Sequence, residues 1–201
     1  MKSGPCVVVL CVLALCAGCG DQPAIRRLSA SSVVVAFGDS LTSGTGARDG
    51  ESYPTLLSGM LACRVINAGV PGENTSAGLR RLPGVLEKER PQLVILCHGG
   101  NDILKDDQQG TISNLNAMIS MVKGTGADII LMGVPRPGLW LKVAPFYQEI
   151  ATKRRVPFDP DTIAQILSSP ALKSDYAHPN AAGYRRLAES VAKLIRDSQR
   201  E

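Results

Sequence analysis

The stretch VVVAFGDSLTSG at residues 33–44 joins a run of five apolar residues directly to a short polar turn. Continuous β-branched runs of this length are typical of strands that are buried on both faces of a parallel sheet. The turn holds a glycine, an acidic residue and Ser40, and parallel α/β sheets bind their ligands where the strands end. The stretch therefore predicts a buried strand with a serine at its carboxyl end.

The rest of the chain alternates short apolar runs with amphipathic segments of helical length. This alternation predicts βαβ units with right-handed crossovers, and hence an α/β fold with a parallel sheet of about five strands covered by helices on both faces. Beyond residues 33–37, we expect strands buried on both faces at 65–68, 93–97 and 129–133, and a short fifth strand at 156–158. Helices are expected near 52–62, 77–90, 111–124, 142–154, 161–168 and 181–197.

Composition places the chain among ordinary globular proteins. Its 201 residues are 44% hydrophobic and 20% charged, which favours one domain. The 22 basic and 18 acidic residues are spread along the chain, and no aromatic residues interleave with the basic pairs. Nucleic acid is therefore not an expected partner.

Residues 1–19 have the pattern of a secretory leader. Lys2 precedes an apolar run at residues 7–17, which is well short of the ~20 residues that span a bilayer. The ending CAGC at residues 16–19 resembles a bacterial lipobox, although Cys16 stands where leucine is usual. We expect lipidation at Cys19, with plain cleavage nearby as the alternative, and hence a location in the bacterial cell envelope, on the periplasmic side. Residues 20–32 are polar and small and are predicted to be a tether, so the folded domain would cover residues 33–201.

The mature chain would retain two cysteines, Cys63 and Cys97. Cys97 ends an apolar run, and Cys63 follows a stretch with helical character. Both patterns are typical of small core residues, so we expect the two thiols to be unpaired.

Polar residues and glycines follow four of the predicted strands. A nucleophilic serine needs a general base, for which imidazole is the usual group. The chain has two histidines, and His178 is the better candidate because Asp175, three residues earlier, can orient its ring. His98 is expected to be a strand-end residue that supports the site from behind.

Acyl transfer also needs donors for the negatively charged oxygen of the tetrahedral intermediate. Three groups at the predicted strand ends fit this role: the backbone N–H of Ser40, the backbone N–H of Gly72 and the side-chain amide of Asn101.

Four motifs together resemble those of the SGNH, or GDSL, hydrolases. They are GDSL at 38–41, Gly72, GGND at 99–102 and DYAH at 175–178, and they span nearly the whole mature chain in the family's order. The resemblance implies a three-layer α/β/α sandwich with a flavodoxin-like sheet. It also implies a catalytic triad of Ser40, Asp175 and His178 and an oxyanion hole formed by Ser40, Gly72 and Asn101. Within the family the likeness is strongest to small bacterial periplasmic thioesterases, lysophospholipases and arylesterases.

Other site chemistries find little support in the sequence. The GxSxG elbow of α/β-hydrolases is absent because Thr42 replaces its second glycine. The glycines at 44, 46 and 50 do not have the GxGxxG spacing of a dinucleotide loop. The few histidines and cysteines are far apart, so we expect neither a metal nor a cofactor.

The function expected from these patterns is hydrolysis of carboxylic esters, including aryl esters, acyl thioesters and lysophospholipids, by a monomeric enzyme. Leu139 and Trp140, which follow the fourth strand, are candidates for an apolar wall that binds the acyl chain. Two alternatives stay open: a carbohydrate O-deacetylase of the same fold, and a non-catalytic envelope lipoprotein that binds an acylated ligand.

Overall fold

The computed structural model describes residues 23–136 and 141–200. The predicted leader with Cys19 lies outside the described residues, and so do Leu139 and Trp140. Among the residues that are described, no helix is long and apolar enough to cross a membrane.

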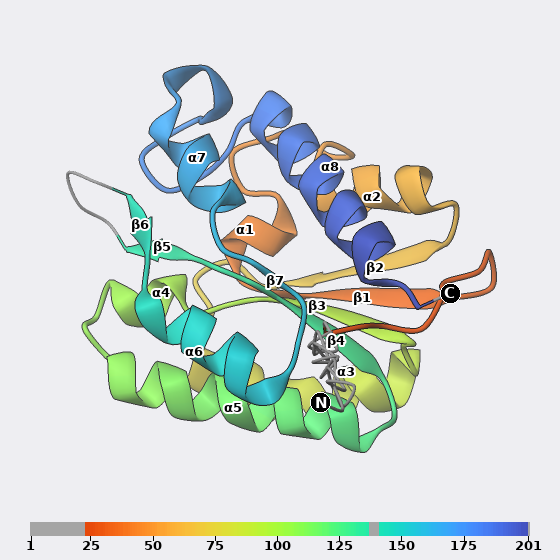
Figure 1. The fold of residues 1–201 in the computed structure, drawn as a ribbon. Coiled ribbons are helices and arrows are strands. Elements are labelled where there is room, and N and C mark those ends of the chain that lie inside the picture. The colour runs from red at the N-terminus through yellow and green to blue at the C-terminus, as the bar shows by residue number, and fades with distance from the viewer. Residues whose placement is uncertain (1–22, 137–140, 201) are drawn as a thin grey trace, which may run out of the picture.

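A parallel sheet of five strands forms the centre of the fold, in the order β2-β1-β3-β4-β7 (Figure 1). With the five strands counted along the chain, this is the flavodoxin-like order 2-1-3-4-5, as the family resemblance implies. Each neighbouring pair is parallel, so all the carboxyl ends meet at one edge. The strands are β1 (Val33–Gly38), β2 (Arg64–Gly69), β3 (Leu93–Cys97), β4 (Asp128–Met132) and β7 (Phe158–Asp159).

Helices cover both faces of this sheet and make the fold a three-layer α/β/α sandwich. In Figure 1, α3, α5 and α6 lie below the sheet, and α2, α7 and α8 lie above it. Two short helices, α1 and α4, follow β1 and β3 at the carboxyl edge. The helices are α1 (Ser40–Ser43), α2 (Tyr53–Leu61), α3 (Thr75–Glu89), α4 (Gly100–Ile103), α5 (Gln108–Gly124), α6 (Pro145–Arg154), α7 (Thr162–Ser168) and α8 (Ala181–Ser198), with a 3₁₀ turn at Pro170–Leu172.

The core is centred on β1 and β3, whose side chains are almost completely excluded from solvent. The residues from Val34 to Phe37 and from Leu93 to Cys97 are each at most 1% exposed. This burial explains why both strands are continuous apolar runs, because helices pack on each of their faces. Both cysteines within the described residues, Cys63 and Cys97, are buried and free, as predicted.

The prediction that the strand at 65–68 is buried on both faces is wrong for β2. This strand pairs only with β1 and forms one edge of the sheet. None of its residues is fully buried, and Arg64 and Asn67 are exposed. The short run at 65–68, which includes the polar Asn67, therefore reflects pairing at an edge and not enclosure.

The predicted tether is also corrected, because its described part packs on the domain. Ile25 is only 2% exposed and bridges Gln199 after α8. Its N–H donates to the Ser198 carbonyl at 2.8 Å. The backbone N–H and side chain of Arg26 both donate to Asp128 at the start of β4. Ile25 and Leu28, which also packs against the core, are the large apolar residues of this polar segment, and the folded domain begins no later than Ile25.

A two-stranded hairpin interrupts the segment that was predicted to be helical from residue 142. Strand β5 (Pro135–Arg136) pairs antiparallel with β6 (Lys142–Val143), and α6 begins only at Pro145. Proline is favourable in the first turn of a helix, where its missing N–H has no partner to lose.

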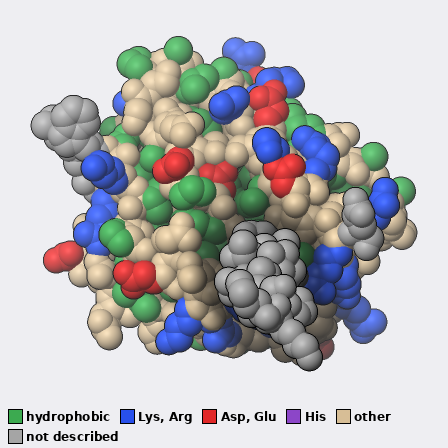
Figure 2. Space-filling model, in the orientation of Figure 1, with side chains coloured by type: hydrophobic (Ala, Val, Ile, Leu, Met, Phe, Trp, Pro, Cys, Tyr) green, Lys and Arg blue, Asp and Glu red, His purple; other side chains and the backbone are tan. Residues whose placement is uncertain are grey.

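Lys and Arg side chains are dispersed around the face of the molecule shown in Figure 2, with Asp and Glu among them.

Candidate active site

Ser40 is the first residue of α1, immediately after β1 reaches the carboxyl edge of the sheet. The turn needs glycine at position 38, because a Cβ there would lie 2.0 Å from the Cys97 carbonyl oxygen and 2.4 Å from Thr42 Oγ1. Asp39 then caps the short helix by accepting the Leu41 N–H at 3.1 Å. The close approach of β1 to β3 thus fixes where the serine stands.

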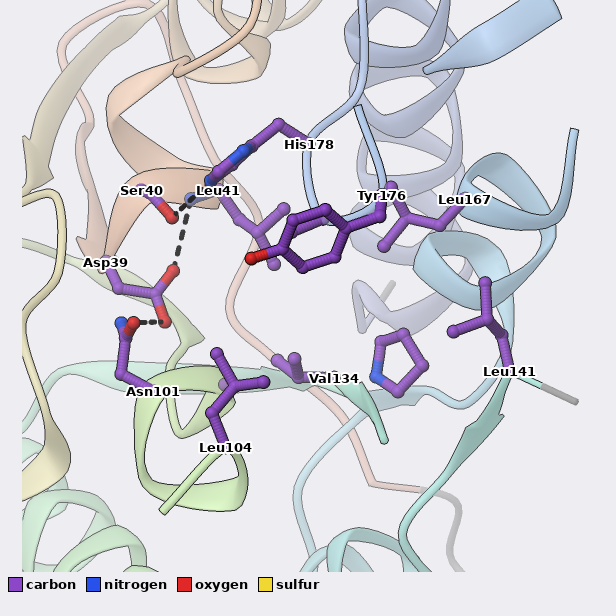
Figure 3. Close-up of a pocket in the computed structure, with 13 residues that line it drawn as sticks. Asp39, Ser40, Leu41, Asn101, Leu104, Val134, Leu141, Leu167, Tyr176 and His178 are labelled. Carbon is purple, nitrogen blue, oxygen red and sulfur yellow. Dashed lines mark hydrogen bonds between the residues drawn. The ribbon is translucent and has the colours of Figure 1, made fainter. Parts of the chain in front are cut away.

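His178 reaches Ser40 from the loop that leads into α8. Its Nε2 lies 3.0 Å from Ser40 Oγ, and its Nδ1 lies 2.9 Å from Asp175 Oδ2 (Figure 3 shows the serine contact). The structure therefore brings together the three residues that the sequence singled out as a triad.

The loop that carries Asp175 and His178 is fixed at both ends. Asn180 caps α8 by accepting the Gly183 N–H at 3.0 Å, while its side-chain amide donates to the Ala171 carbonyl at 2.9 Å. Ser174 donates its backbone N–H to the His178 carbonyl at 2.9 Å. These contacts place the imidazole without the help of a substrate.

Asp175 is held in its ionised form by its own turn. Partial burial raises the pKa of this carboxyl, but hydrogen bonds from the His178 ring and from the backbone N–H groups of Ala177 and His178 lower it, and the net pKa is below the ordinary value. The two backbone bonds measure 2.7 and 2.8 Å. Asp175 therefore faces His178 Nδ1 as a carboxylate, which favours the tautomer with a proton on Nδ1 and a free Nε2.

The three predicted oxyanion donors differ in their surroundings. Ser40 and Asn101 both line the pocket described below. The Asn101 amide donates to the Glu73 carbonyl at 2.9 Å and lies 3.5 Å from Asp39 Oδ2. Gly72 is not among the pocket-lining residues; it is exposed in the loop before Glu73, with a φ of +74° that favours glycine.

Asp39 is a buried acid beside the site that the sequence analysis did not assign. Its side chain is 2% exposed, and burial raises the pKa of its carboxyl, although the nearby His98 and His178 and the Leu41 N–H oppose that shift. The sequence feature that could have drawn attention to Asp39 is its place within the GDSL motif, between a strand and Ser40. Its contacts are those of a residue that orders the turn.

The second histidine, His98, does not touch Ser40. It is fully buried at the end of β3, and its Nε2 lies 3.2 Å from Glu73 Oε2. It therefore lies behind the site, as expected, and brings with it a glutamate that sequence reasoning missed.

A pocket of about 180 Å³ opens beside Ser40 and His178. Apolar side chains from several elements form its walls, and Figure 3 shows them arranged around the opening opposite the serine. Two of them, Leu104 and Tyr176, are 55% and 76% exposed, which is unusual for large hydrophobic residues. The apolar lining residues are Leu41, Leu104, Val134, Pro135, Leu141, Leu167, Tyr176 and Ala177.

Within residues 23–136 and 141–200, no group of three or more His, Cys, Asp or Glu side chains could hold a metal ion. The groups that the structure places at the pocket are a hydroxyl, an imidazole and a carboxylate in one hydrogen-bonded line, with the Asn101 amide beside them.

Residues 36–186 match the GDSL-like Lipase/Acylhydrolase family, and this range includes both Ser40 and His178. The chain belongs to this family. Arylesterase of Vibrio mimicus is 31% identical to it over 178 residues, which are 83% of this chain and 89% of the relative. Thioesterase 1/protease 1/lysophospholipase L1 of Escherichia coli strain K12 is 28% identical over 178 residues, which are 84% of this chain and 86% of the relative.

The solved structures agree with this assignment. The crystal structure of TesA superposes with a TM-score of 0.73 at 26% identity, covering 82% of this chain and 98% of that one. The GDSL-family chain described here is thus an ester hydrolase of the SGNH fold. The alternative of a non-catalytic lipoprotein finds no support in these relatives.

Proposed function

We propose that the chain hydrolyses carboxylic esters and acyl thioesters with Ser40 as nucleophile, His178 as general base and Asp175 as the carboxylate that orients the base. The observation that carries the proposal is the continuous hydrogen-bonded line from Asp175 through His178 to Ser40, with contacts of 2.9 and 3.0 Å. The line ends at the mouth of an apolar pocket, where an acyl group can lie against the hydroxyl.

The chemistry proceeds by two acyl transfers. His178 Nε2 takes the proton of Ser40 Oγ while that oxygen attacks the carbonyl carbon. The imidazolium that forms is stabilised by Asp175 and then protonates the leaving alcohol or thiol as the tetrahedral intermediate collapses. Water, activated by the same imidazole, releases the carboxylic acid from the acyl-enzyme and returns the proton to Ser40.

The oxyanion of each intermediate is assigned to the backbone N–H groups of Ser40 and Gly72 and to the Asn101 side chain. An amide nitrogen has two N–H groups, and one N–H of Asn101 is engaged by the Glu73 carbonyl. The second makes a long contact of 3.5 Å with Asp39 Oδ2, and it is the N–H that we assign to the oxyanion in the pocket that Asn101 lines.

The substrates proposed are esters with an apolar acyl or aryl group. The lining of the pocket is mainly apolar, and two large hydrophobic residues, Leu104 and Tyr176, extend it at the surface. The names of the relatives, arylesterase and thioesterase/lysophospholipase, support aryl esters, thioesters and lysophospholipids as the classes to test. The wall assigned to Leu139 and Trp140 stays a prediction.

We further propose that the enzyme is a monomer of the bacterial cell envelope, held at a membrane by a lipid on Cys19. The support is the leader-like pattern of residues 1–19.

The test of the proposed chemistry is the hydrolysis of p-nitrophenyl butyrate by purified Ser40→Ala. We expect activity to fall to the level without enzyme. The matched control is Ser113→Ala, since Ser113 is exposed on α5 and should leave the rate unchanged. Substantial activity in Ser40→Ala with a normal fold would refute the role of Ser40.

A further inference from the structure

We propose that Glu73 is a positioning residue for the oxyanion hole: Arg81 and His98 fix its carboxylate, and its backbone in turn holds the Asn101 amide and the loop that carries Gly72. The inference rests on the function proposed above and goes beyond it, because none of these three side chains lines the pocket. We call Glu73, Arg81 and His98 the loop clamp.

The carboxylate of Glu73 accepts N–H groups at both of its oxygens. Arg81 Nε donates to Oε1 at 2.9 Å, and Arg81 Nη2 donates to Oε2 at 2.7 Å. His98 Nε2 lies 3.2 Å from the same Oε2. Because the Glu73 side chain is only 6% exposed, these bonds are poorly screened and set its position firmly.

Arg81 is itself held from two sides. Its guanidinium lies 4.2 Å from the centre of the Phe37 ring on β1, a cation–π contact. Its Nη2 also donates to the Ala68 carbonyl at 3.0 Å, near the end of β2. The arginine therefore ties the loop after β2 to the central strand that delivers Ser40.

The tautomer of His98 follows from its backbone neighbour. The Gly99 N–H donates to His98 Nδ1 at 3.0 Å, so Nδ1 carries no proton and Nε2 is the donor to Glu73. The ring also lies against α3 at Gly78, where a Cβ would be 2.4 Å from Nε2. His98 thus has one orientation available.

The clamp reaches the reacting atoms through the main chain of Glu73. The Glu73 carbonyl accepts one N–H of Asn101 at 2.9 Å and so sets the direction of the other. Gly72, the second proposed donor, is joined directly to Glu73. Burial raises the pKa of Glu73, but Arg81 and His98 hold it below its ordinary value, so the carboxylate stays ionised at neutral pH.

The variant that tests the clamp is Glu73→Gln. Both carboxylate oxygens accept N–H groups, so the amide nitrogen of glutamine would face a donor at either end. The loop should shift, and a small misplacement of catalytic groups is costly in rate. We expect kcat for p-nitrophenyl butyrate to fall by about 10- to 100-fold while KM changes less than about threefold. The control Glu89→Gln removes the carboxylate of a peripheral ion pair with Arg64 and should leave both constants unchanged.

A double-mutant cycle separates positioning from a general loss of structure. If Glu73 acts through Asn101, Glu73→Gln should reduce kcat less in the Asn101→Ala background than in the wild-type chain. Full additivity of the two losses, or a loss of thermal stability with kcat unchanged, would overturn the inference.

A second variant guards against misfolding of Glu73→Gln. Arg81→Lys keeps the charge but loses the two-point bond, whereas Arg81→Gln loses both. We expect a graded fall in kcat, with Lys between wild type and Gln, and equal rates in all three would contradict the clamp. Failure of the proposed function is distinguishable, because Ser40→Ala would then stay active whatever the clamp variants do.

Discussion

Ser40 and His178 are 138 positions apart in the chain, yet Ser40 Oγ and His178 Nε2 lie 3.0 Å from each other. The parallel sheet makes this meeting possible: β1 delivers the serine to the carboxyl edge, and the loop before α8 returns to the same edge. Tyr184 holds α8 against the segment after α1, since its hydroxyl donates to the Thr45 carbonyl at 2.7 Å. The two ends of the domain are thereby packed against each other beside the pocket.

Asp175→Asn should reduce kcat by about 10³–10⁴-fold at neutral pH, because an amide would neither select the His178 tautomer nor stabilise the imidazolium. KM for a p-nitrophenyl ester should change little. Steady-state kinetics measure both constants, and Asp49→Asn, at an exposed position, is the control. A loss below about tenfold would show that Asp175 is dispensable as the orienting carboxylate.

Shortening the exposed apolar residues at the pocket mouth should change chain-length preference. Tyr176→Ala and Leu104→Ala should each lower kcat/KM for p-nitrophenyl octanoate by roughly fivefold, corresponding to about 1 kcal/mol of lost apolar contact. The acetate ester, which is too short to reach them, should be hydrolysed as by the wild type. Equal losses on acetate and octanoate would mean that these residues order the site instead of binding the acyl chain.

Asp39 predicts a pH-dependent difference in stability. Burial raises the pKa of Asp39 above 3.8 in the folded protein, so folding favours the protonated carboxyl. The resulting contribution to the free energy of unfolding is fully present below the unfolded pKa and is lost as the pH rises through the folded pKa. Asparagine is uncharged and can still accept the Leu41 N–H. Urea unfolding at about pH 4 and about pH 7 should therefore show that the free energy of unfolding of Asp39→Asn, relative to that of the wild type, is higher at the higher pH. A constant difference at both pH values would contradict the raised pKa.

The lipid anchor is tested in cells of a bacterial host. The wild-type chain should incorporate an alkyne-tagged fatty acid and fractionate with membranes, whereas Cys19→Ser should do neither. Cys63→Ser, at a buried position in the folded domain, controls for labelling at other thiols. Equal labelling of the wild type and Cys19→Ser would exclude lipidation at this residue.

Much of the fold is readable from the sequence because the strands at its centre are buried on both faces. The runs at 33–37 and 93–97 are apolar throughout, and the structure has strands there with those limits to within one residue. Edge positions are harder to predict: the run at 65–68 contains the polar Asn67 but is otherwise apolar, and β2 pairs on one side only. The β5–β6 hairpin was missed because two-residue strands leave no periodic pattern.

The residues of the site also differ in how well the sequence predicts them. Ser40, Asp175 and His178 were found because each belongs to a short motif with its own chemistry. Glu73 and Arg81 were not singled out, since an acid and a base eight residues apart resemble any solvated pair until the fold buries the acid. Tyr176 lies within the DYAH motif and Leu104 shortly after GGND, but only the tertiary structure shows that both border one pocket.

The most direct test of the central claim is to map where a fluorophosphonate reacts with the native protein. An activated serine should be modified once per chain, and peptide mass spectrometry should place the adduct on Ser40, with hydrolysis lost in proportion to labelling. His178→Ala should slow the labelling strongly. An adduct on another residue, or an unlabelled protein that hydrolyses esters at full rate, would contradict the account.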